Sequence, residues 1–71
     1  MSKDKMNEAI IKRWNERVIP LGLDEMGAEG AEVYLSKYGK GIGNDKLQAF
    51  ADYAYSLGLK EFGDVMIANL K

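Results

Sequence analysis

The amino-acid sequence predicts an all-α fold: four short helices arranged as two helix-turn-helix hairpins in a single domain of residues 1–71. Apolar residues recur at helical spacing in four segments, and turns that contain glycine separate those segments. In addition, a short stretch beginning at Leu21 is repeated 36 residues later, at Leu57, which suggests that the two hairpins resemble each other.

The first hairpin is expected over residues 4–38. Its first helix is predicted over roughly residues 4–18, because apolar side chains recur there every four positions. These side chains are Met6, Ile10, Trp14 and Val18. Pro20 disfavours helical geometry at Ile19 and therefore ends this helix.

The second helix is harder to place, because Gly27 and Gly30 each cost about 1 kcal/mol relative to alanine inside a helix. We therefore expect it to begin only near Ala28 and to end at Tyr38. Its apolar face is predicted to consist of Ala31, Tyr34, Leu35 and Tyr38. A linker over residues 39–44, with glycine at every second position, then separates the two hairpins.

The second hairpin is expected over residues 45–70. Asn44 or Asp45 is predicted to cap its first helix. The apolar stripe of that helix consists of Leu47, Phe50, Ala51, Ala54 and Leu57. Gly58 is expected to take the left-handed position of a Schellman ending, with Leu59 as the accompanying apolar residue.

The last helix is predicted from about Lys60 to Asn69, with Phe62, Val65, Met66 and Leu70 buried. Five of the seven residues from Leu21 to Gly27 are identical to those from Leu57 to Gly63. The same offset pairs Trp14 with Phe50 and Val18 with Ala54. We therefore expect two related hairpins, if their helix boundaries also correspond.

The composition argues against most kinds of catalysis. The chain has no His and no Cys, so it offers no imidazole base, no thiolate nucleophile and no usual structural zinc site. We therefore expect a protein that is not an enzyme, without catalytic, cofactor-binding or metal-ligating residues. The formal charge of −1 gives no long-range attraction to DNA or to an anionic membrane. No signal-peptide pattern and no membrane-length apolar run is present, so a soluble cytoplasmic protein is expected.

Two apolar residues are candidates for a protein-binding surface. Tyr55 and Ile67 each lie about 100° of helical rotation away from the apolar stripe of their helix. Either they fill gaps between steeply crossed helices, or they belong to an interface with another protein or with a second copy. The acidic residues near the start of the second helix could extend this interface, or could simply stabilise the helix through its dipole. These residues are Asp24, Glu25, Glu29 and Glu32.

A nucleic-acid-binding helix-turn-helix in the second hairpin is the alternative, because Ala54, Gly58 and Leu59 have the spacing typical of that motif. Asp64 stands where the motif requires an apolar residue, and acidic residues balance the basic ones around it. The candidate contacts to an anion or a nucleic acid are Lys37, Lys40, Lys46 and Lys60.

The sequence thus favours a small helical protein that binds another protein as a regulator, adaptor or inhibitor. Its size would suit a product of a phage or a mobile element.

Overall fold

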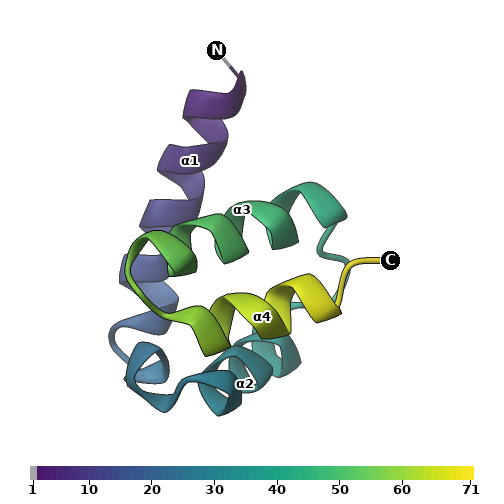
Figure 1. Cartoon of the computed structure of the whole chain (residues 1–71). Coiled ribbons are helices and arrows are strands. Elements are labelled where there is room, and N and C mark those ends of the chain that lie inside the picture. The colour runs from purple at the N-terminus through teal and green to yellow at the C-terminus, as the bar shows by residue number, and fades with distance from the viewer. Residues whose placement is uncertain (1) are drawn as a thin grey trace.

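The computed structural model describes the backbone of residues 2–71 and the side chains of residues 7–71. Four α-helices follow one another along the chain: α1 (Ser2–Arg13), α2 (Ala28–Tyr38), α3 (Asn44–Ser56) and α4 (Lys60–Ala68) (Figure 1). A π-helical turn, η1 (Trp14–Val18), continues α1, and a 3-10 helix, η2 (Leu23–Met26), precedes α2. Within the described residues there is no strand, so the predicted all-α fold of four helices is confirmed. None of these helices combines the length and the apolar character that crossing a membrane requires.

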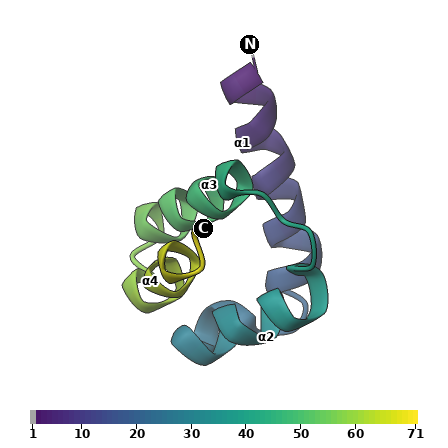
Figure 2. The same ribbon diagram turned by 90° about the vertical axis from the view of Figure 1, so that its right-hand side faces the viewer.

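The helices pack in two ways. α3 and α4 are joined by a short turn and lie side by side in opposite directions (Figure 1). α2 packs against η2 and α4, whereas α1 packs against α3 and crosses it steeply (Figure 2). The first turns of α1 extend beyond the other helices (Figures 1 and 2).

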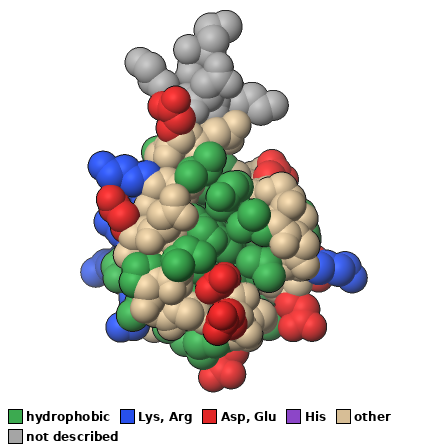
Figure 3. Space-filling view, turned by 90° about the vertical axis from the view of Figure 1, so that its left-hand side faces the viewer, with side chains coloured by type: hydrophobic (Ala, Val, Ile, Leu, Met, Phe, Trp, Pro, Cys, Tyr) green, Lys and Arg blue, Asp and Glu red, His purple; other side chains and the backbone are tan. Residues whose placement is uncertain are grey.

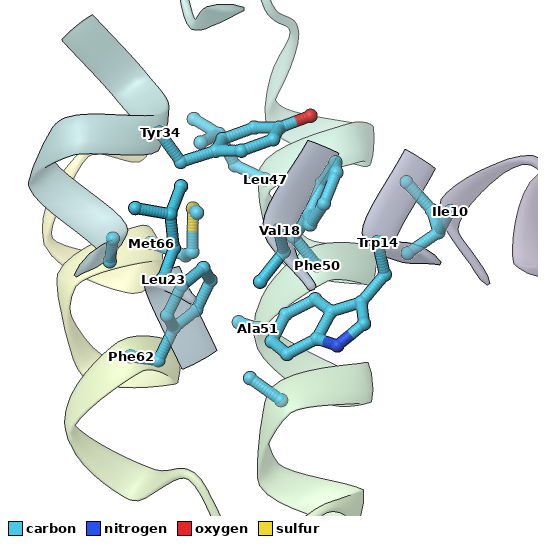
Figure 4. Packing of buried hydrophobic residues seen from close by; sticks show 12 residues of the cluster. Ile10, Trp14, Val18, Leu23, Tyr34, Leu47, Phe50, Ala51, Phe62 and Met66 are labelled. Atoms are coloured by element: carbon cyan, nitrogen blue, oxygen red, sulfur yellow. The ribbon is translucent and has the colours of Figure 1, made fainter. Parts of the chain in front are cut away.

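The core contains a continuous set of aromatic and aliphatic side chains from every helix (Figure 4). Trp14 packs against two other rings, with its ring centroid 4.8 Å from that of Phe62 and 5.4 Å from that of Tyr53. On the other side, the ring of Tyr34 lies 4.9 Å from that of Phe50. Aromatic pairs at such tilted or edge-on angles stabilise a core beyond the area that they bury. The buried apolar residues are Ile10, Trp14, Val18, Leu23, Ala31, Tyr34, Leu47, Phe50, Ala51, Ala54, Phe62 and Met66.

The end of α3 confirms the predicted Schellman motif. Gly58 has a φ of +79°. Its amide donates to the carbonyl of Tyr55 at 3.0 Å, and the amide of Leu59 donates to the carbonyl of Ala54 at 2.9 Å. These are the two hydrogen bonds that define the motif, and they turn the chain directly into α4.

The first helix ends differently from the predicted regular helix over residues 4–18. Its last five residues form a π-helical turn, in which the amide of Ile19 donates to the carbonyl of Trp14 at 3.0 Å. Pro20 follows directly, and an α-helix could not have continued there because proline has no amide hydrogen to donate. Trp14 and Val18 are nevertheless buried as predicted, whereas Met6 lies outside the described side chains.

Three further expectations are wrong. Neither Asn44 nor Asp45 caps α3, because Gly43 occupies the cap position. Leu57 is 47% exposed, since it belongs to the turn after α3 and not to its apolar stripe. Tyr38 is also exposed at its edge, and the guanidinium of Arg17 lies 4.7 Å from its ring centroid.

The predicted internal repeat is not confirmed. Gly22 and Gly58 share a left-handed conformation, with φ values of +68° and +79°. The segments that follow them differ, because Leu23 begins a 3-10 helix whereas Leu59 leads directly into α4. Ile11 is exposed although its counterpart Leu47 is buried, so the two halves do not use the same helix boundaries and faces.

Candidate protein-binding surface

Tyr55 is held between the two helices of the second hairpin. A Cβ atom on Gly63 would lie 2.6 Å from the Cε1 atom of Tyr55, so the ring packs directly over this glycine. The hydroxyl of Tyr55 donates to Oδ1 of Asp64 at 2.6 Å. This hydrogen bond, together with some desolvation, raises the pKa of Tyr55. The other side of the ring is open to solvent, and 39% of the residue is exposed.

The side chain of Ile67 is less exposed than that of Tyr55. It is half-buried and packs against the core cluster. It lies one helical turn beyond Gly63, on the same face of α4. Of the two apolar anchors expected from the sequence, therefore, Tyr55 offers an exposed surface and Ile67 only an edge.

The four acidic candidates divide into two pairs. Asp24 and Glu25 line a hollow of about 300 Å³ between η2 and the start of α4. Glu61, which sequence analysis did not single out, lines the same hollow. Glu29 and Glu32 are exposed on α2 and do not line this hollow.

The four candidate lysines do not form one surface. Lys60 lines the hollow beside the acidic residues. Lys46 is in the first turn of α3, and the antiparallel pairing with α4 places it at the opposite end of the hairpin from Lys60 (Figure 1). Lys37 and Lys40 are exposed at the end of α2 and in the linker.

A second hollow, of about 230 Å³, lies between α1 and α3. Its apolar lining comes from Ile10, Ile11, Ala49 and Tyr53, and Ser56 lines it at the end of α3. Ser56 and Gly58 therefore line different hollows, and Leu57, which lines neither, lies between these two residues in the sequence. In the hollow between η2 and α4, Glu25 and Gly27 are lining residues, and Met26 lies between these two in the sequence.

We use the name turn surface for the two hollows together with three exposed large apolar residues in or beside them. These residues are Ile11, Met26 and Leu57. Figure 3 shows the face that carries α1 and the α3–α4 turn: hydrophobic side chains gather at its centre, with acidic side chains below them. Sequence analysis named Asp24, Glu25 and Lys60 of this surface but did not identify Ile11, Met26 and Leu57 as part of a binding surface. The signal for Leu57 was its place directly before Gly58, which makes it the C-cap residue of α3 rather than part of the helix.

Among the side chains that the structure describes, no three acidic groups converge as ligands for a metal ion. Comparison of the chain with models of protein families, with curated proteins and with solved structures finds no match. Any function must therefore be argued from the surface itself.

Proposed function

We propose that this chain acts by binding another protein through the turn surface, as a small cytoplasmic regulator, adaptor or inhibitor. The observation that supports the proposal is the position of Leu57, a large apolar side chain that is 47% exposed between two hollows. Single exposed apolar residues are common on protein surfaces, but Leu57 directly follows Ser56 of one hollow and precedes Gly58 of the other, so an exposed apolar residue adjoins both.

The predicted anchors fit this proposal to different degrees. Tyr55 is in the last turn of α3, two residues before Leu57, and its free ring face can extend the contact. Asp24 and Glu25 add acidic groups at the rim of one hollow. Ile67 contributes less, because it already packs against the core.

The nucleic-acid alternative is less well supported. The fully exposed ionisable side chains of α4 are Lys60, Glu61 and Asp64, so the helix that would enter a DNA groove has a net negative face. Phosphate groups repel such a face. Of the other candidate lysines, Lys46 lies at the opposite end of the hairpin, and Lys37 and Lys40 lie at the end of α2 and in the linker.

The experiment is capture of a partner from the source cells on immobilised protein, followed by reconstitution of the complex with the purified partner. Leu57→Asp is expected to weaken the reconstituted complex about tenfold or more, because it introduces a charge at the centre of an apolar contact. Ser36→Asp adds the same charge at an exposed position of α2 and is the matched control. Equal affinities of the two variants would show that the turn surface does not bind the partner.

A further inference from the structure

The hollow between η2 and α4 combines an apolar floor with an acidic rim. Leu59 is half-buried among its lining residues and supplies the apolar floor, whereas Phe62 is 0% exposed and belongs to the core beneath. Around them stand the carboxylates of Asp24, Glu25 and Glu61. Such a hollow suits a ligand that is both apolar and positively charged.

The charges of the three carboxylates are not neutralised by the side chains that the structure describes. Among the described side chains, none of them takes part in an ion pair, and none accepts a side-chain hydrogen bond. Lys60 lines the same hollow, so one positive charge faces three negative ones. The net charge around the hollow is therefore negative, although the chain as a whole carries a formal charge of only −1.

The side chain of Glu61 lies close to the backbone of Gly27. Its Oε2 atom lies 2.8 Å from the place where a Cβ atom on Gly27 would be. Any larger residue at Gly27 would therefore displace the carboxylate, and the φ of +61° at this position disfavours such residues as well. Glu61 of α4 and Asp24 and Glu25 of η2 thus line the same hollow from two different elements.

From this arrangement, and resting on the proposed function, we propose that the hollow binds a cationic, apolar segment of the partner protein. The segment supplies an arginine or lysine whose aliphatic stem lies on Leu59. Its charged head lies among the three carboxylates, where a guanidinium can donate to more than one of them. A neighbouring apolar residue of the partner packs against Met26 or Leu57.

Other ligand classes fit this hollow poorly. The same carboxylates repel phosphate groups, and with them nucleic acids and anionic lipid surfaces. The carboxylates of the described residues also do not converge as metal ligands do. A small hydrophilic cation would leave the apolar floor and the exposed Met26 and Leu57 without a contact.

The test is selection of peptides from a random linear library, displayed on phage, against three immobilised proteins. These are the wild type, the double variant Asp24→Asn/Glu25→Gln, and the control Glu16→Gln/Glu32→Gln. The control removes the same number of charges at exposed positions outside the hollow. Wild type and control are expected to enrich arginine or lysine next to apolar residues, and Asp24→Asn/Glu25→Gln is not.

The enriched peptide is then synthesised and titrated into each protein. Its affinity for Asp24→Asn/Glu25→Gln is expected to be about tenfold weaker than for the wild type, with little change for the control. Its chemical-shift changes should centre on residues 24–27 and 58–62. Enrichment of peptides without basic residues, or equal weakening in both double variants, would overturn the proposal.

The outcome for the captured partner separates this proposal from the general one. If Leu57→Asp weakens the reconstituted complex and Asp24→Asn/Glu25→Gln does not, the turn surface binds the partner. The proposal that the hollow binds a cationic segment of that partner is then wrong. If both variants weaken it and the control does not, both proposals are supported. If neither variant weakens it, both proposals fail.

Discussion

The ring of Tyr55 lies on the backbone of Gly63, where even a methyl group would come within 2.6 Å of the ring. The hydroxyl of the same tyrosine is hydrogen-bonded to Asp64, the next residue along α4. This contact ties the end of α3 to α4. It also explains why a helix can carry a glycine at a buried position despite the cost of glycine in helices.

The effect of Gly63→Ala should therefore depend on residue 55. In the wild type, alanine must displace the ring and its hydrogen bond, and we expect the free energy of unfolding to fall by about 1 kcal/mol. In a Tyr55→Ala background the ring is absent. There the higher helix propensity of alanine should raise the free energy of unfolding by up to about 1 kcal/mol. Denaturant unfolding of the four proteins gives the coupling energy directly. The same change in both backgrounds would contradict the packing that we describe.

The hydrogen bond to Asp64 should also be visible in the titration of Tyr55. The bond is made by the protonated hydroxyl, so it raises the pKa of Tyr55 above the usual 10.0. Its contribution to stability is therefore present below pH 10.0 and is lost as the pH rises through the raised pKa. Absorbance titration of the wild type minus Tyr55→Phe isolates this tyrosine. Asp64→Ala should lower its pKa, and an unchanged value would show that the bond does not form in solution.

Close packing of α2 on η2 depends on Gly30. A Cβ atom there would lie 1.8 Å from the carbonyl oxygen of Leu23, a backbone atom that cannot rotate away. Gly30→Ala is expected to lower the free energy of unfolding by about 3 kcal/mol, because one of the two segments must move. Gly43→Ala is the control, because nothing lies within 4 Å of its Cβ position and its φ is negative. Equal unfolding midpoints for the two variants would contradict the close approach.

The end of the chain is tied back to the start of α3. The side-chain amide of Asn44 donates to the carbonyl of Lys71 at 2.9 Å and its Oδ1 atom accepts from the amide of Lys71 at 3.0 Å. Asn44→Ala removes both bonds and should lower the free energy of unfolding by about 1 kcal/mol. Hydrogen exchange at the amide of Lys71 should accelerate in this variant and not in Asp45→Ala. Equal exchange rates in the two variants would show that the pair does not form.

The sequence predicted the helices well where periodicity and turn chemistry agree. The apolar residues of α3 and the glycine at its end lead to the observed Schellman turn, and the spacing of Ile10, Trp14 and Val18 predicted the buried face of the first helix. The expected cap at Asn44 was wrong for a reason that local sequence does not contain. Its side chain binds Lys71, which is distant in the sequence and close only after folding.

The candidate surface was only partly predictable. The helical angle of Tyr55 showed that it lies off the core stripe. It did not show that the side chain contacts Gly63 and Asp64 on the next helix. The hollow formed by Asp24, Glu25 and Glu61 depends on how η2 packs beside α4, and the internal likeness of the two hairpins pointed to a different arrangement. Contacts between elements, and not the pattern within one element, decide both cases.

The most direct test of the proposed function is a nuclear magnetic resonance titration of the labelled protein with its purified partner. We expect chemical-shift changes to centre on Ile11, Met26 and Leu57 and on the residues that line the two hollows. Residues 36–41, at the end of α2 and in the linker, should change little. Shifts centred on that segment, or on Lys37, Lys40 and Lys46 together, would contradict binding through the turn surface.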